Sequence, residues 1–214
     1  MAEDLYPLVT FDGKSGPPFF VFTSNVDNGF LKAGFPDSNL IECHGTISFL
    51  QCVAHCTPDV WPTPHDLDVD VDEDTFRAEG EMPTCIHCDG LARPNVMMFG
   101  DWTFSHTRLD RQEAAYDAFT TTLKRWAKYE GDDCVAIVEI GAGKTVPTVR
   151  RTSERLAATL GSSATLIRIN PADQDIPDIS PARPVSIPMG GLAALSAIRD
   201  VIAELRADDD DDDE

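Results

Sequence analysis

Apolar runs alternate with amphipathic stretches along the second half of the chain. Between Arg108 and Tyr129 the apolar positions recur every three to four residues, which predicts a helix with one buried face. The run from Cys134 to Ile140 predicts a strand. The elements predicted after it are a helix over Thr148 to Leu160 that ends at Gly161, a strand over Ala164 to Ile169, a strand over Val185 to Ile187, and a helix from about Leu192 to Leu205. This alternation predicts an α/β fold with a parallel, doubly wound sheet.

The first half of the chain has shorter apolar runs, and polar residues follow two of them. The run 19–23 ends abruptly in the polar stretch 24–27, as a buried parallel strand does when it leads into a ligand-binding loop. The run 39–43 presents His44 at its end, and 95–99 is a further strand candidate. The sequence therefore predicts a binding crevice at the carboxyl ends of these strands.

Four cysteines in two close pairs predict a zinc module inserted over residues 46–92. The pairs are Cys52 with Cys56 and Cys85 with Cys88. Two such pairs fold together into a tetrahedral thiolate site, and with four protein ligands the metal is structural. The histidines inside the pairs, at positions 55 and 87, are alternative ligands, and the acidic stretch 66–74 between the pairs predicts a projecting loop.

Charge and composition limit the partners of the protein. Of the net charge of −20, the segment 208–214 carries seven negative charges, and the segment 57–84 has nine acidic residues against Arg77. We expect the tail over 207–214 to be disordered. An acidic chain repels nucleic-acid phosphates, and no apolar run approaches the roughly 20 residues of a membrane span, so neither partner is expected. Cysteine usage favours a reduced, intracellular location in cytoplasm or nucleus, and the length favours one domain with a small insert.

Three local features have two readings each. The turn Gly141-Ala142-Gly143 after a predicted strand resembles a phosphate-binding turn at a helix start, but it also fits a tight strand-to-helix connection. His44 is either a crevice base, since an imidazole can accept a proton near neutral pH, or a structural histidine. Asn25 and Asp27 alternate on one loop, where they either face a ligand together or act as turn and cap residues.

Taken together, these residues resemble the sirtuins, the NAD-dependent protein deacylases. The segments that carry the resemblance, apart from the two cysteine pairs, are Thr23-Ser24-Asn25-Val26-Asp27, Glu42-Cys43-His44-Gly45, Arg93 to Asp101, Ile140-Gly141-Ala142-Gly143, Ile169-Asn170 and Gly190-Gly191-Leu192. Their order and spacing agree with the family from about residue 19 to residue 205. The resemblance implies a Rossmann-like catalytic domain with a zinc module inserted.

The resemblance also implies a role for each matching residue. His44 would be the general base that acts on the ribose of NAD+ while acyl-lysine displaces nicotinamide. Val96, Met97, Met98 and Phe99 would form the acyl-lysine channel, beside which a protein or peptide substrate adds as a strand. The remaining cofactor-binding residues would be Ser24, Asn25 and Asp27 on the nicotinamide side, with Gly141, Ala142, Gly143, Asn170, Gly191 and Leu192 on the adenosine and phosphate side.

The sequence departs from the family pattern in three places. Ser24 stands where the family has a ribose-contacting Gln, and Gly143 where it has the Ser of Gly-Thr-Ser. The family's opening Gly-Ala-Gly-x-Ser turn does not occur before Phe19, so we expect an N-terminally incomplete catalytic domain. The alternative to an NAD-dependent deacylase, or a related ADP-ribosyl-transferring enzyme, is a catalytically silent fragment that binds zinc and either acyl-lysine peptide or nucleotide. A zinc-ribbon module for nucleic acid is disfavoured by the charge.

Overall fold

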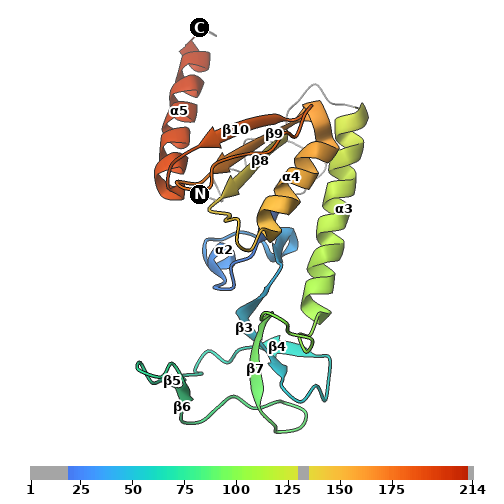
Figure 1. Ribbon diagram of the computed structural model, residues 1–214, viewed down its shortest axis with the longest axis vertical. Coiled ribbons are helices and arrows are strands. Elements are labelled where there is room, and N and C mark those ends of the chain that lie inside the picture. Colours follow the sequence, from blue (N-terminus) through green and yellow to red (C-terminus); the bar gives the residue numbers. More distant parts are fainter. Residues whose placement is uncertain (1–18, 130–134, 212–214) are drawn as a thin grey trace. The chain divides into compact units, whose positions relative to one another are not determined.

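The computed structural model describes residues 19–129 and 135–211 of the chain. Its residues fall into two compact units, with the boundary inside a long helix, between Thr120 and Thr121 (Figure 1). The sequence analysis predicts one domain with an insert, whereas the contacts gather into these two units, which are described separately below. None of the helices in the described residues is both long and apolar enough to cross a membrane.

The first unit begins with two short parallel strands. Strand β1 (Val21–Thr23) pairs in parallel with β2 (Leu40–Glu42), and helix α2 (Gly29–Lys32) and a 3-10 turn (Asp37–Asn39) lie between them in the sequence. The first part of helix α3 (Thr107–Tyr129) packs on these strands. The apolar residues that make this contact are Phe20, Phe22, Ile41, Phe104, Leu109 and Tyr116. The predicted parallel strand at residues 19–23 is therefore confirmed, with a later start.

The cysteine-bearing part of the first unit is built on an antiparallel sheet of order β4-β3-β7. Its strands are β3 (Gly45–Cys52), β4 (Val60–Pro62) and β7 (Ala92–Val96). The predicted strand over 95–99 is thus misplaced, because the segment that pairs with β3 lies three residues earlier and 97–99 follow the strand end. Pro94 is tolerated inside β7 because this strand lies at the edge of the sheet, where a missing N–H costs no pairing on the outer side.

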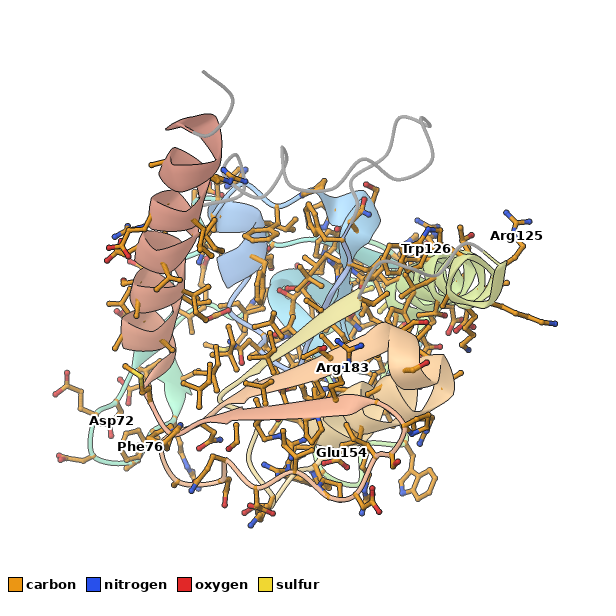
Figure 2. The ribbon with its side chains drawn as sticks, turned by 90° about the horizontal axis from the view of Figure 1, so that it is seen from above. Asp72, Phe76, Arg125, Trp126, Glu154 and Arg183 are labelled. Carbon is orange, nitrogen blue, oxygen red and sulfur yellow. The ribbon has the colours of Figure 1, made fainter. Side chains whose placement is uncertain are left out.

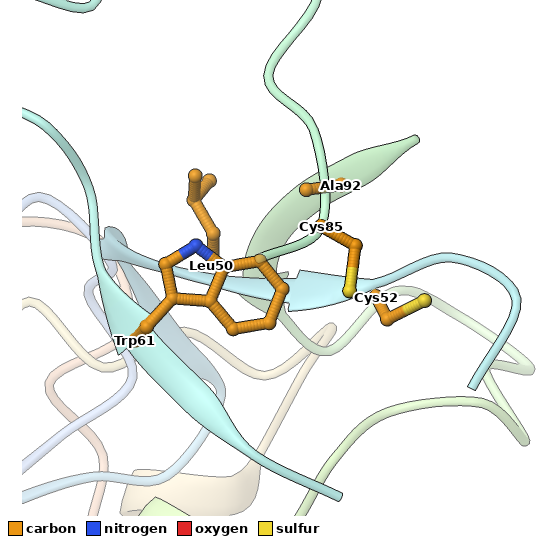
Figure 3. Packing of buried hydrophobic residues seen from close by; sticks show 5 residues of the cluster. All are labelled: Leu50, Cys52, Trp61, Cys85 and Ala92. Atoms are coloured by element: carbon orange, nitrogen blue, oxygen red, sulfur yellow. The ribbon is translucent and has the colours of Figure 1, made fainter. Parts of the chain in front are cut away.

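A small apolar core stabilises this module. The buried side chains that pack together are Leu50, Cys52, Trp61, Cys85 and Ala92, two of which are cysteines of the predicted metal site (Figure 3). We refer to residues 46–92 as the cysteine module.

The acidic segment of the cysteine module is a hairpin instead of the predicted loop. Strands β5 (Asp70–Val71) and β6 (Ala78–Glu79) pair antiparallel. The carboxylate of Asp72 accepts hydrogen bonds from the backbone N–H of Thr75 at 2.6 Å and from its hydroxyl at 2.7 Å, which closes the turn. Phe76 follows with its ring 83% exposed (Figure 2). The charge pattern of this segment does not show the turn, which depends on these local side-chain bonds.

The second unit is a three-stranded parallel sheet with one α-helix between its first two strands and another after its last strand. The elements in chain order are β8 (Val135–Ile140), α4 (Thr148–Leu160), a 3-10 turn (Gly161–Ser163), β9 (Ala164–Ile169), β10 (Arg183–Ile187) and α5 (Gly191–Asp211). The strand order is β10-β9-β8, and α4 packs against β8 and β9. The predicted parallel α/β class is confirmed, and α4 and β9 have the predicted bounds.

The carboxyl end of the second unit differs from the prediction, whereas the predicted start of β8 is not tested. Cys134, the predicted start of β8, lies outside the described residues. Helix α5 continues past Leu205 to Asp211, so the backbone of 207–211 is helical where a disordered tail was expected, and 212–214 lie outside the described residues. An α-helix extends easily from a formed turn because each added residue contributes one hydrogen bond, even where the sequence alone would not start a helix.

Candidate functional site

His44 lies where three segments of the first unit meet. It follows β2 directly, and the backbone N–H of Cys43 bonds to the carbonyl of Thr23 at the end of β1 at 2.9 Å. The carbonyl of His44 accepts a bond from the N–H of Met97 at 2.9 Å, which joins it to the segment after β7. The predicted general base is therefore bonded through its backbone to the start of the predicted acyl-lysine segment.

The loop that carries Ser24, Asn25 and Asp27 is held close to the same place. The carbonyl of Val26 accepts bonds from the N–H of Ile47 at 2.9 Å and from the hydroxyl of Thr46 at 3.3 Å. Ile47 is available for this bond because the β3–β7 register shifts between Thr46 and Leu50. Asp27 also has the local turn role that the sequence left open, since its carboxylate accepts the N–H of Gly29, whereas at Asn25 the backbone N–H bonds to the hydroxyl of Thr23.

Gly45 is required by the close approach of β7. Its φ is 77°, and a Cβ at this position would lie 2.0 Å from the carbonyl oxygen of Asn95. Only glycine avoids both the left-handed strain and this clash. The glycine after His44 therefore brings the backbones of β3 and β7 together next to the predicted base.

A charged clamp shapes the predicted acyl-lysine segment. The guanidinium of Arg93 donates to the carboxylate of Asp101 at 2.6 Å and to the carbonyl of Val96 at 3.1 Å. Asp101 also accepts bonds from Thr103 and from the N–H of Met98. Burial alone raises the pKa of Asp101, but the bonds from Thr103 and Arg93 outweigh it and hold the pKa at about 2. The clamp closes a loop on which Met98 and Phe99 are 61% and 92% exposed.

Buried amides connect the same strands to the start of α3. The Nδ2 group of Asn95 donates to Oε1 of Gln51 at 2.8 Å, and the Nε2 group of Gln51 donates to the carbonyl of Thr103 at 2.7 Å. Both side chains are 1% exposed. Ser105 completes the set, with its carbonyl bonded to Asn95 and its N–H to Gln51. No local sequence pattern predicts this network, because its partners are far apart along the chain.

The four predicted metal ligands converge in the cysteine module. All four sulfur atoms, of Cys52, Cys56, Cys85 and Cys88, lie within 4.8 Å of one another. The sulfurs of Cys52 and Cys88 are 3.8 Å apart, and those of Cys56 and Cys85 are 3.5 Å apart. Thiolates bound to one zinc ion at about 2.3 Å in a tetrahedron lie about 3.8 Å from each other. The donor set and its spacing therefore fit a tetrahedral zinc ion.

The contacts among the cysteines shift the pKa values of their thiols in opposite directions, and the neighbouring Cys88 raises the pKa of Cys56. A hydrogen bond from the backbone N–H of Cys56 lowers the pKa of the Cys52 thiol to about 6. The N–H of His87 points at the sulfur of Cys85, at 3.4 Å. The ring of His87 is paired with Asp59 at 2.9 Å, and neither His55 nor His87 belongs to the cysteine cluster within the described residues.

The second unit gathers its predicted cofactor residues at the carboxyl ends of β8, β9 and β10. Gly141 follows β8 with φ 68° and donates its N–H to the carbonyl of Ile169 at 3.0 Å. The side chain of Asn170 donates to the carbonyl of Ala142 at 3.2 Å, which joins the two strand-end loops. Helix α4 begins at Thr148, as predicted, so the segment 144–147 lies between this turn and the start of the helix.

Gly191 and Leu192 lie at the start of α5. A Cβ on Gly191 would lie 2.8 Å from the side chain of Ile140, so glycine lets α5 begin against the end of β8. Leu192 is 80% exposed. Gly143, the remaining predicted residue, has open space around it, with Asp173 as its nearest neighbour at 3.9 Å.

Buried arginines fix the loop after Asn170. Arg150 of α4 donates to the carbonyls of Ala142, Asp173 and Asp175 at 3.2, 2.7 and 2.8 Å. Arg168 of β9 is fully buried and pairs with Glu139, its neighbour across the sheet, and with Glu154 of α4 at 2.8 Å. The sequence held a signal for this pair, since each charge interrupts an apolar strand and a buried charge needs a partner.

Unit by unit, the structure brings most of the predicted site residues together. The first unit has a parallel strand pair, a histidine at the strand end and a four-sulfur cluster, and the second has a parallel sheet with glycine turns at its carboxyl edge. These features define an α/β protein with glycine-containing loops at its strand ends and a compact cysteine module. The sequence matches the Sir2 family over residues 11–121, slightly more than half of the chain. The chain belongs to this family, the sirtuins.

Curated relatives agree with this assignment. The NAD-dependent protein deacetylase HST2 of Candida albicans is 28% identical over 116 residues, which is 47% of this chain and 31% of that protein. The NAD-dependent protein deacylase of Rhodopirellula baltica is 27% identical over 146 residues, 68% of this chain and 54% of that protein. A probable bifunctional ADP-ribose hydrolase/ADP-ribosyltransferase of Fusarium oxysporum f. sp. cubense is 29% identical over 161 residues, 72% and 26% of the respective chains. The matches thus span about a quarter to a half of the relatives' own length.

Proposed function

We propose that this protein removes acyl groups from lysine side chains in an NAD-dependent reaction, with the cysteine module holding a structural zinc ion. The observation that carries the proposal is the position of His44. Its backbone is bonded to the segment that resembles the acyl-lysine channel, and Val26, in the loop that carries Asn25 and Asp27, is bonded to β3 just beyond it. Family membership and the names of the deacylase relatives support the same reaction.

The residues of the first unit would divide the work as follows. Asn25 and Asp27 would orient the nicotinamide end of NAD+. Departure of nicotinamide makes the ribose carbon reactive toward the acyl oxygen. His44 would accept a proton from a ribose hydroxyl, a role that suits an imidazole near neutral pH. Val96 to Phe99 would bind the acyl-lysine chain beside the added substrate strand, in the shape that the Arg93–Asp101 clamp maintains.

The second unit would bind the adenosine and phosphate part of the cofactor. Gly141 and Gly143 carry no side chain that would block approach of a phosphate to the backbone, and Asn170 fixes the neighbouring turn. Gly143 takes the place of a family serine, so we expect a weaker hold on the cofactor, with the loss seen in KM for NAD+.

The test is an assay of nicotinamide release and of loss of the acetyl group from an acetyl-lysine peptide. We expect both products from the wild-type protein, in equal amounts, and neither above background from His44→Ala. His106→Ala is the control, because His106 is an exposed histidine of the same unit whose ring meets that of Phe104 edge to face. Absence of both products from wild-type protein that contains zinc would contradict the proposal and favour the silent binding fragment.

A second candidate function is transfer of ADP-ribose to a protein. It is favoured by the relative from Fusarium oxysporum, whose match covers 72% of this chain. The same assay separates the two reactions. Nicotinamide release without deacetylation, together with a mass gain of one ADP-ribosyl group on an acceptor protein, would establish transfer in place of deacylation.

A further inference from the structure

A buried polar anchor fastens the end of β2 to helix α3. Glu42, two residues before His44, is 2% exposed, and its carboxylate accepts a bond from Arg108 at 2.6 Å. Its backbone N–H donates to Oε1 of Gln112 at 3.1 Å, and Arg108 donates to the same oxygen at 3.4 Å. Arg108 and Gln112 are one helical turn apart and so lie on the same face of α3.

The buried polar groups of this anchor are less favourable for stability than apolar side chains would be. Burial raises the pKa of Glu42, and Arg108 only opposes that effect. The Nε2 group of Gln112 is buried with no hydrogen-bond partner in the described part of the chain. A buried ion pair adds little stability over apolar side chains of similar volume, and an unpaired buried N–H is unfavourable. An apolar contact would hold α3 on the sheet as well, so the polar set calls for a geometric explanation.

The anchor fixes the position and orientation of the end of β2 relative to α3. Hydrogen bonds fix both the side chain and the backbone of Glu42, whereas apolar contacts would let β2 slide or rotate. Thr46, two residues after His44, is fully buried and bonds to the carbonyl of Val26. The guanidinium of Arg108 also lies over the ring of Phe49, 4.8 Å from its centre, so it contacts β3 as well. Fixed residues therefore flank His44 on both sides.

We propose that Arg108 and Gln112 are positioning residues for His44, which hold the end of β2 so that the imidazole keeps one orientation. The inference rests on the proposed function for its catalytic meaning. Its structural content is a prediction about the mobility of residues 43–47, which can be measured without cofactor or substrate.

The decisive test is amide hydrogen exchange of the zinc-loaded protein, comparing wild type with Arg108→Met and Gln112→Leu. We expect exchange in 43–47 to become at least tenfold faster in both variants, with exchange in α4 unchanged. Arg111→Met is the matched control, since Arg111 is an exposed arginine of the same helix. Phe119→Leu, which loses ring contact with Phe20, serves as a variant that is destabilised without touching the anchor.

The outcomes separate a positioning role from a general stabilising one. If Phe119→Leu accelerates exchange in 43–47 as much as Arg108→Met at an equal loss of melting temperature, the anchor is only structural and the proposal is wrong. Unchanged exchange in a folded Gln112→Leu would also overturn it.

The catalytic consequence is read from steady-state kinetics. In Arg108→Met, kcat should fall at least tenfold while the KM for NAD+ and for peptide changes less than threefold, with partial recovery in Arg108→Lys. A fall in apparent activity that only reflects less folded protein would contradict positioning. If the wild-type protein shows no turnover, the deacylase proposal fails, whereas the exchange experiment still decides whether the anchor orders His44.

Discussion

The cysteine module and the parallel sheet of the second unit are held together by different means. The module has a core of five residues, two of them cysteines, and apart from β3 and β7 its strands have two or three residues (Figure 3). The sheet has strands of five or six residues, a helix with several buried side chains, and an ion-pair network between sheet and helix. An apolar core as small as that of the module cannot offset the entropy of ordering the chain, so metal ligation has to contribute most of its stability.

Removal of the metal should have the largest effect and should act on one region only. We expect Cys85→Ser, or a chelator added to the wild-type protein, to release the zinc and unfold the cysteine module, because structural zinc contributes about 10 kcal/mol or more in small modules. Limited proteolysis should then cut within 52–92 while the second unit stays protected. The measurement is metal content together with mass analysis of the fragments. Equal zinc in Cys85→Ser and wild type would remove Cys85 from the ligand set.

Breaking the buried charge network should damage the second unit instead. Arg168→Met leaves Glu139 buried without its cation, which we expect to cost about 3–5 kcal/mol of unfolding free energy. The exposed Arg183→Met on the neighbouring strand β10 should change it by less than about 0.5 kcal/mol (Figure 2). Denaturant unfolding gives both values. Similar losses in the two variants would show that the buried pair is not what distinguishes this sheet.

Comparing Gly45 with Gly34 separates the free-energy cost of a steric clash with β7 from the cost of a strained backbone. Both have positive φ, 77° and 88°, but a Cβ on Gly34 meets no atom within 4 Å, whereas one on Gly45 meets the carbonyl of Asn95. We expect Gly34→Ala to cost about 1 kcal/mol and Gly45→Ala about 3 kcal/mol, since the second variant must also separate β3 from β7. Melting curves measure the difference. Equal costs would show that β3 and β7 separate easily at Gly45, and would contradict a close and rigid contact between these strands.

How much the sequence could predict also differs between the two regions. Long periodic segments such as α3 and α4 are read directly, because each turn repeats the same apolar spacing. In the first unit β3 was overlooked and β7 was misplaced, because their pairing depends on a register shift and on Pro94 at an edge, which no periodic pattern shows.

The residues of the candidate site also differ in how well the sequence predicts them. His44 and the four cysteines stand in short motifs, so they could be named from the sequence. Their supports could not, because Gln51 and Asn95 are 44 residues apart and Glu42 and Arg108 are 66 apart. The available signal was weaker: an acidic residue inside the apolar run 40–43 implies a buried cation, without saying which one.

The bonds of Asp101 should make the stability of the protein depend on pH at the acid side of the range. The pKa of Asp101 is about 2 in the folded protein, below the value near 3.9 of an unfolded chain. Its bonds to Thr103 and Arg93 therefore contribute fully above about pH 4, and this contribution, about 2 kcal/mol, is lost as the pH falls from 4 toward 2. Asp101→Asn should lower the unfolding free energy by about this amount at pH 7, and the difference from wild type should shrink toward pH 3. Asp117→Asn, which removes an exposed carboxylate from α3, controls for the change in net charge. Carbon-13 titration of the Asp101 carboxyl group gives the pKa directly, and a midpoint near 4 would show that the clamp does not hold the charged form.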